Sequence, residues 1–462
     1  MSRHNAGVKS MNQIFAKTAL LPDGWARDVL VTLDQGRIAR VETGVAGQGE
    51  AVDCLLPAAV NLHSHAFQRA MAGLTERRSA GQDSFWTWRT LMYRFLDHLT
   101  PEDVQAIAAM VMVEMAEAGY AAVAEFHYLH HAPGGARYDD PAEMSARIAA
   151  AAADTGFGLT HLPVLYSRGG CDNRPLTAGQ QRFGNTPDQF AALWHAAENA
   201  LNSLPPDTVL GVAPHSLRAA SPEGLTLAAS LSPTTPIHIH VAEQVAEVTE
   251  VLASTGQRPV DWLLSHQAVN SRWCLIHATQ MTPEETEAMA RSGAVAGLCP
   301  ITEANLGDGI FDGARYLAAG GAFGVGSDSN IRISLTEELR LLEYSQRLGL
   351  KGRAILASPE KSCGRTLYEG AVSGGATAAG RHSGAIAIGQ WADLVALDLT
   401  HPDVAGAQGD VILDTFLFAR DDRMVSALWS AGRRLVSGGR HHARDRVTRA
   451  YAATVARLRG VL

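Results

Sequence analysis

The stretch AAVNLHSH, residues 58–65, decides the fold, because an apolar run typical of a buried strand ends there in two histidines. Ala/Leu/Glu-rich stretches such as 101–119 and 221–231 are typical of helices that begin at Pro or Ser. Strand-like runs alternate with these helical stretches. After the first run, seven more strand-like runs follow: AAVAEFHY (121–128), GLTHLPVLY (158–166), VLGVAPHS (209–216), PIHIHVAE (236–243), RWCLIHAT (272–279), AVAGLCP (294–300) and AFGVGSD (322–328). Eight alternations of strand and helix predict an α/β fold, a (β/α)₈ TIM-like barrel over residues 58–385.

Both ends of the chain are rich in residues that favour strands. NQIFAKTALLP and DVLVTLD lie before residue 57, and DLVALDL (393–399) and the run 424–438 lie near the C-terminus. Because the two ends of a domain often lie close together, we expect residues 1–57 and 386–462 to form one small β-sandwich beside the barrel.

Composition excludes several classes of function. With a net charge of -8, the 462-residue chain has no electrostatic attraction for nucleic acid or anionic membranes. No apolar stretch approaches a membrane span and no signal peptide is evident. The five cysteines are scattered and form no Cys-x-x-Cys pair, which argues against a disulfide framework or a thiolate zinc site. We therefore expect a cytoplasmic protein that acts on a small molecule.

Polar residues at the ends of these strands are the candidate site, because barrel active sites lie at the carboxyl ends of the strands. His63 and His65 are two apart and share one face of their strand. His240 ends the fifth run and Asp328 the eighth. Each alone could be a surface histidine or a turn residue, but their order along the strands favours a metal site. Imidazole and carboxylate ligands suit one Zn²⁺, although Fe²⁺ or Mn²⁺ also fits them.

The order NLHSH, HVAE, HAT and GSDS resembles the amidohydrolase superfamily, in its deaminase and chlorohydrolase branch, over nearly the whole chain. The resemblance implies that His63, His65, His240 and Asp328 are the metal ligands. It implies Glu243 as proton shuttle and His277 as a partner of the bound water or substrate. Many members hold two metals bridged by a carbamylated lysine, but no lysine occurs between Lys17 and Lys351, so we expect a single metal.

A closer resemblance is to the formimidoylglutamate deiminases of histidine degradation. It rests on NLHSHAFQRAMAGLTE (61–76), SFWTWR (84–89), AEFHYLHH (124–131), APHSLRA (213–219), HIHVAEQ (238–244) and CPITEANLGDGIF (299–311). It implies zinc-dependent hydrolysis of N-formimidoyl-L-glutamate to N-formyl-L-glutamate and ammonia, by a homodimer. It also implies a substrate-binding set, in which the arginines suit the two carboxylates: Gln68, Arg89, Tyr128, His215 and Arg218.

Other interpretations remain open from the sequence. Another deaminase of the same branch would act on a purine, a pyrimidine or a guanidino compound. A catalytically silent barrel that serves as a scaffold would be expected to lose some of the ligands, and all of them are present. The aromatic run at 85–88 could form a lid or pack in the core, and packing is the commoner role of such a run.

Overall fold

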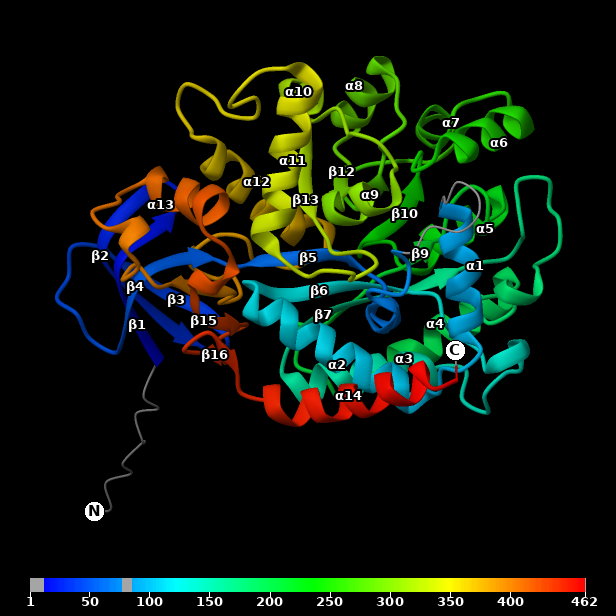
Figure 1. Ribbon diagram of the computed structural model, residues 1–462, viewed down its shortest axis with the longest axis horizontal. Helices are drawn as coiled ribbons and strands as arrows, with labels where there is room; N and C mark the ends of the chain where they lie inside the picture. The colour runs from blue at the N-terminus through cyan, green and yellow to red at the C-terminus, as the bar shows by residue number, and fades with distance from the viewer. Residues whose placement is uncertain (1–11, 77–84, 462) are drawn as a thin grey trace, which may run out of the picture.

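All eight predicted barrel strands are present in the computed structural model, which describes residues 12–76 and 85–461 (Figure 1). The fourth is divided at Gly211 into two short strands. The strands are β5 (Ala59–Ser64), β6 (Tyr120–His127), β7 (Gly158–Leu165), β8 (Val209–Leu210), β9 (Ala213–Pro214), β10 (Ile237–Val241), β11 (Trp273–His277), β12 (Val295–Leu298) and β13 (Ala322–Val325).

These strands form two parallel groups, β5-β6-β7-β8 with β9 beside β7, and β10-β11-β12-β13. Two bridges, Val212 with Ile237 and Ser216 with His240, join the groups along one seam, and one bridge, Ser64 with Asp328, joins them along the other. At the second seam the Asp328 N–H donates to the His63 carbonyl at 2.9 Å. The ring of strands is therefore closed, as predicted, and its closure brings the first and eighth strands' polar residues together.

Helices follow the strands around the barrel. The predicted helices at 101–119 and 221–231 correspond to α2 and α5, and each begins where a hydroxyl side chain caps a Pro-started turn, Thr100 and Ser221 respectively. Of the helices described, none has the length and apolarity that crossing a membrane requires. Their bounds are α1 (Phe85–Leu96), α2 (Pro101–Glu117), α3 (Glu143–Thr155), α4 (Pro187–Leu201), α5 (Pro222–Leu231), α6 (Val245–Thr255), α7 (Pro259–His266), α8 (Pro283–Ser292), α9 (Pro300–Leu306), α10 (Gly313–Ala318), α11 (Leu335–Leu350) and α12 (Cys363–Ala378).

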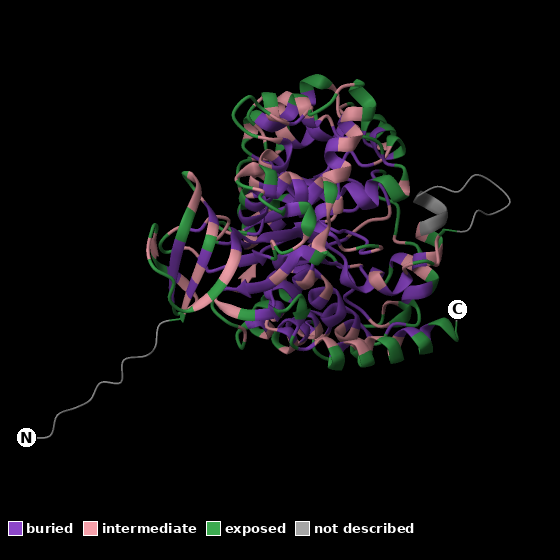
Figure 2. Cartoon of the chain, turned by 60° about the vertical axis from the view of Figure 1, so that its left-hand side comes forward, coloured by how far each residue is buried: buried purple, intermediate pink, exposed green. Residues whose placement is uncertain are grey.

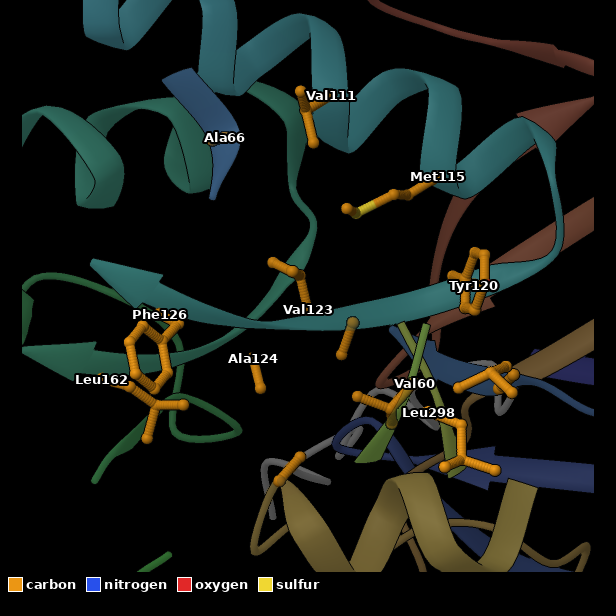
Figure 3. Close-up of a cluster of buried hydrophobic side chains, with 14 of the residues drawn as sticks. Val60, Ala66, Val111, Met115, Tyr120, Val123, Ala124, Phe126, Leu162 and Leu298 are labelled. Atoms are coloured by element: carbon orange, nitrogen blue, oxygen red, sulfur yellow. The ribbon is translucent and has the colours of Figure 1, made fainter. Parts of the chain in front are cut away.

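The hydrophobic core extends along the strands as far as their carboxyl ends. Every residue of β6 is buried, as expected for a parallel strand covered on both faces. Figure 3 shows Val111 and Met115 of α2 pointing toward this strand, with Phe126 on its other face. Inside the barrel the Phe126 ring lies against the His63 ring, with 5.0 Å between centroids. The apolar interior of the barrel therefore fixes one wall of the candidate site.

The two ends of the chain form one eight-stranded sheet beside the barrel. In this sheet β14 pairs antiparallel with β4, with Leu394 opposite Pro57. Figure 2 shows exposed and intermediate residues among the buried ones in this sheet, although every residue of β14 is buried. The boundaries at 57/58 and 385/386 stay a prediction. The sheet order is β17 (Arg440–His441), β16 (Arg433–Ser437), β15 (Val425–Ser430), β14 (Leu394–Leu397), β4 (Glu50–Pro57), β1 (Asn12–Leu21), β2 (Gly24–Asp34) and β3 (Arg37–Glu42).

Two helices follow in the C-terminal segment, α13 (Asp410–Asp414) and α14 (Arg444–Arg459). The last lies along α2 of the barrel rather than on the sheet (Figure 1). Arg444 pairs with Glu117 at 2.7 Å, and the Tyr451 hydroxyl donates to the Arg69 carbonyl at 3.3 Å. The sequence did not indicate α14, because its buried apolar residues are few and far apart.

A buried ion network ties the barrel to the sheet. The Arg381 side chain, fully buried after α12, contacts Asp207 at 2.7 Å and Asp393 at 2.6 Å. Arg433 of β16 also contacts Asp207 with both terminal nitrogens, each at 2.7 Å. Burial alone would raise the carboxyl pKa, but the two guanidinium groups lower the pKa of Asp207 to about 2. Asp207 is therefore the anion that the two arginines share, and Asp393 is a second anion for Arg381.

Replacing Asp207 with asparagine should lower the free energy of unfolding by about 3–5 kcal/mol, because two arginines lose their shared anion. Urea denaturation measures this. The exposed Asp445, which pairs with Arg440, is the control, and Asp445→Asn should cost less than about 1 kcal/mol. The stabilisation by Asp207 is complete above its unfolded pKa of about 3.9 and is lost as the pH falls toward 2. Equal losses in the two variants would contradict this role.

Candidate active site

Four side chains converge at the carboxyl ends of β5, β10 and β13, and we call them the ligand cluster: His63, His65, His240 and Asp328. Their potential donor atoms all lie within 4.8 Å of one another, and all four residues are buried. One Asp328 oxygen is 3.2 Å from Nε2 of His65 and 3.4 Å from Nε2 of His63. The Nε2 atoms of His63 and His240 are 3.1 Å apart.

Hydrogen bonds behind the cluster set the orientation of two of its rings. Nδ1 of His65 is 2.9 Å from the Phe126 carbonyl, and Nδ1 of His240 is 3.1 Å from the His215 carbonyl. A carbonyl only accepts, so Nδ1 carries the hydrogen in each ring and the Nε2 lone pair of the neutral ring faces the cluster. These two histidines are therefore preset as ligands, while packing against Phe126 holds the His63 ring.

The charge state of the cluster also suits a cation. Burial lowers the pKa of His63 to about 3 and, with help from neighbouring imidazoles, the pKa of His240 well below 6.5. Burial opposes ionisation of Asp328, but its close contacts with the His63 and His65 rings hold its pKa well below the ordinary value. Neutral imidazoles beside an ionised carboxylate are the protonation states that metal binding requires. The donor set fits one divalent metal and does not by itself choose among zinc, iron and manganese.

His277 connects the cluster to a second carboxylate. Its Nε2 is 3.9 Å from Asp328 Oδ2 and 3.9 Å from Glu243 Oε1. Burial disfavours a charged ring, yet Glu243, Glu303 and Asp328 together raise the pKa of His277 to about 10. The loop that carries Glu243 is itself held, since the Glu243 N–H donates to the buried Glu247 carboxylate at 3.0 Å. Such closely spaced acid and base groups can transfer protons.

A cavity opens onto the ligand cluster. Gln68 and Tyr128 are hydrogen bonded to each other at 2.6 Å across its wall. All five predicted substrate-binding residues line it together with part of the ligand cluster and three apolar residues that the sequence did not indicate. The lining is His65, Gln68, Arg89, Met92, Tyr128, Tyr166, Phe183, His215, Arg218, His240, Glu243, His277, Leu306 and Asp328.

Tyr166 is a further cavity residue that sequence reasoning missed. Its hydroxyl accepts a hydrogen bond from Arg89 at 2.7 Å and another from Gln180 at 2.8 Å. The signal was available, because Tyr166 is the polar residue that ends the third strand-like run, GLTHLPVLY. The question whether the aromatic run at 85–88 forms a lid or packs in the core concerns side chains outside the described ones.

The chain is similar to known proteins over nearly its whole length. The profile of the Amidohydrolase family matches residues 54–435, and that of the "Formimidoylglutamate deiminase HutF, N-terminal domain" matches residues 11–51. A formimidoylglutamate deiminase of Pseudomonas aeruginosa is 47% identical over 453 residues, 97% of this chain and 100% of that protein. A 5-methylthioadenosine/S-adenosylhomocysteine deaminase of Natronomonas pharaonis is 26% identical over 84% of each chain.

Among solved structures, an amidohydrolase from Brucella melitensis is 49% identical. It superimposes with a TM-score of 0.94 and covers 97% of this chain and 99% of its own. The two family profiles taken together, the sequence relative and the solved structure all extend over most of the barrel and the sheet. The chain therefore belongs to the amidohydrolase family, in the group that includes formimidoylglutamate deiminase.

Proposed function

We propose that the protein hydrolyses the formimidoyl group of N-formimidoyl-L-glutamate, a step of histidine degradation, and releases ammonia and N-formyl-L-glutamate. The observation that carries the proposal is near-full-length identity of 47% to a formimidoylglutamate deiminase, together with the match to that protein's N-terminal domain. The cavity supports it, because carboxylate-binding arginines and the ligand cluster line the same space.

The two arginines account for the substrate's two carboxylates. A guanidinium group offers a rigid pair of donors that matches a carboxylate, and both Arg89 and Arg218 line the cavity. Gln68 and Tyr128, held together at 2.6 Å, and His215 complete the proposed binding set. A substrate anchored by its carboxylates would extend its formimidoyl end toward the ligand cluster.

We further propose one Zn²⁺ in the ligand cluster, a cytoplasmic location and a homodimer. A bound zinc ion supplies Lewis-acid chemistry, which lowers the pKa of water toward neutrality. The single-metal proposal rests on the donor set and on the absence of any lysine between Lys17 and Lys351.

The protein's own acids and bases account for the proton transfers. Asp328 accepts a proton from the attacking water as its oxygen bonds to the formimidoyl carbon, and Glu243 carries that proton to the terminal nitrogen. His277, 3.9 Å from both carboxylates, orients the water and the forming hydroxyl group. The hydroxyl proton then moves to the nitrogen, the carbon–nitrogen bond breaks, and the carbonyl forms as ammonia leaves. Water thus supplies the formyl oxygen and two of the three ammonia hydrogens.

Replacing Tyr166 with phenylalanine should raise KM about tenfold and change kcat little, because Arg89 loses the hydroxyl that orients it for substrate binding. Steady-state kinetics of ammonia release measures both constants. Tyr316 is the matched control, since its buried hydroxyl bonds to the Ala294 carbonyl outside the cavity. A fall in kcat at constant KM in the Tyr166 variant would contradict a binding role.

A substrate panel tests the proposed function against the other deaminases of the branch. We expect rapid ammonia release from N-formimidoyl-L-glutamate and little from adenosine, 5-methylthioadenosine or guanidino acids. An aromatic base needs stacking and amide contacts, whereas this cavity contributes two guanidinium groups. Preferential deamination of a purine would contradict the proposal.

A further inference from the structure

The carboxylate of Glu303 lies behind His277 on the side away from Glu243. Its Oε1 is 3.3 Å from Nδ1 of His277, and both residues are buried. The same oxygen accepts the Cys299 N–H at 2.8 Å, so the carboxylate is itself fixed at the start of α9. Glu303 belongs to the stretch CPITEANLGDGIF, and the sequence suggested no role for this glutamate.

This contact determines which ring nitrogen of His277 faces the reaction. A carboxylate accepts hydrogen bonds, so the Nδ1 hydrogen of His277 points to Glu303. Nε2 is then directed to the opposite side, 3.9 Å from Glu243 and 3.9 Å from Asp328. His277 also has a left-handed backbone conformation, with φ of 70°, which β-strand neighbours do not normally adopt. The 3.3 Å contact with Glu303 is thus the observation that bears on the orientation of the ring.

We propose that Glu303 is the positioning residue that holds His277 with Nε2 between Glu243 and Asp328. The expected effect on kcat rests on the proposed deimination. The expected effect on the orientation of His277 rests on the contact alone. Partners of this kind, which orient a side chain in a metal site without touching substrate, typically contribute about 10- to 100-fold.

Two other roles for Glu303 are distinguishable. It could merely cap α9, a role that Glu338 also serves, because the buried Glu338 carboxylate accepts the Ile301 N–H at 2.9 Å. Alternatively, His277, Cys299 and Glu303 offer three donor atoms within 4.8 Å of one another and could hold a second metal. We favour the hydrogen bond, because Nδ1 of His277 and the Glu303 oxygen already satisfy each other at 3.3 Å.

Three variants separate these roles: Glu303→Ala, Glu303→Gln and the control Glu338→Gln. We expect Glu303→Ala to lower kcat about 10- to 100-fold with KM within about threefold and one metal per chain retained. Glu303→Gln keeps an acceptor oxygen and should recover most of that loss. Glu338→Gln removes a carboxylate from the same helix start and should leave kcat unchanged. Equal losses of kcat in Glu303→Ala and Glu338→Gln, or a second metal equivalent that disappears in Glu303→Ala, would overturn the proposal.

A spectroscopic measurement tests the contact without any substrate. In protein labelled with ¹⁵N-histidine, the hydrogen-bonded Nδ1 proton of His277 is assigned by its absence in His277→Gln. We expect this signal in the wild type, in Glu303→Gln and in Glu338→Gln, and its loss in Glu303→Ala. Persistence of the signal in Glu303→Ala, or its absence from the wild type, would overturn the proposal. If the wild type released no ammonia from N-formimidoyl-L-glutamate, the proposed function would be wrong, yet this signal would still decide the role of Glu303.

Discussion

Replacing Glu243 with glutamine should lower kcat by about 10³-fold, because the amide cannot carry a proton to the leaving nitrogen. The side chain remains nearly the same in size, and its backbone N–H keeps the Glu247 carboxylate that holds the loop. KM should therefore change little, and metal content should stay the same as in the wild type. Steady-state ammonia release and elemental analysis of the purified variant measure these quantities.

Two controls distinguish the loss of a proton carrier from a general loss of structure in the Glu243 variant. Glu338→Gln, which changes a buried carboxylate outside the cavity, should retain full activity. The Glu243 variant should also bind substrate with unchanged affinity by calorimetry. Turnover within about threefold of the wild type would rule out Glu243 as the proton shuttle.

Replacing His240 with alanine should reduce bound metal from about one equivalent to less than about a tenth and abolish activity, because three ligands remain of a buried four-ligand set. The loss should persist after dialysis against excess zinc. Inductively coupled plasma mass spectrometry on folded protein, monitored by circular dichroism, gives the metal content directly.

His238 is the matched control on the same strand. Its Nε2 bonds to the Ala378 carbonyl at 2.7 Å and it takes no part in the ligand cluster. His238→Gln should retain the metal even if it unfolds at a lower temperature. A fully loaded His240→Ala protein would contradict the ligand assignment.

Much of the fold was predictable because apolar residues are spaced differently in strands and in helices. The eight apolar runs ending in polar residues identified the barrel, and the ends of those runs carry His63, His65, His240, Glu243 and Asp328. The carboxyl ends of parallel strands meet at one edge, so residues far apart in sequence could be grouped without coordinates.

What sequence reasoning missed depends on contacts that no local pattern encodes. Glu303 lies five residues after the end of β12, within the first turn of α9, and not at a strand end. Its contact with His277 therefore could not be inferred from the spacing of the strands. Tyr166 is different, because it ends the third strand-like run and its position alone could have indicated it. The helix α14 lacks a continuous apolar stripe, because Val447, Val455 and Leu458 are its buried residues and ion pairs such as Arg444 with Glu117 add to its contact with α2.

The identity of the products tests the central claim most directly. Wild-type protein loaded with zinc is incubated with N-formimidoyl-L-glutamate labelled with ¹³C at the formimidoyl carbon, and the label is followed by NMR. Cleavage of the terminal carbon–nitrogen bond predicts labelled N-formyl-L-glutamate and one ammonia per substrate consumed. Labelled formamide with free glutamate, or unchanged substrate, would contradict the account.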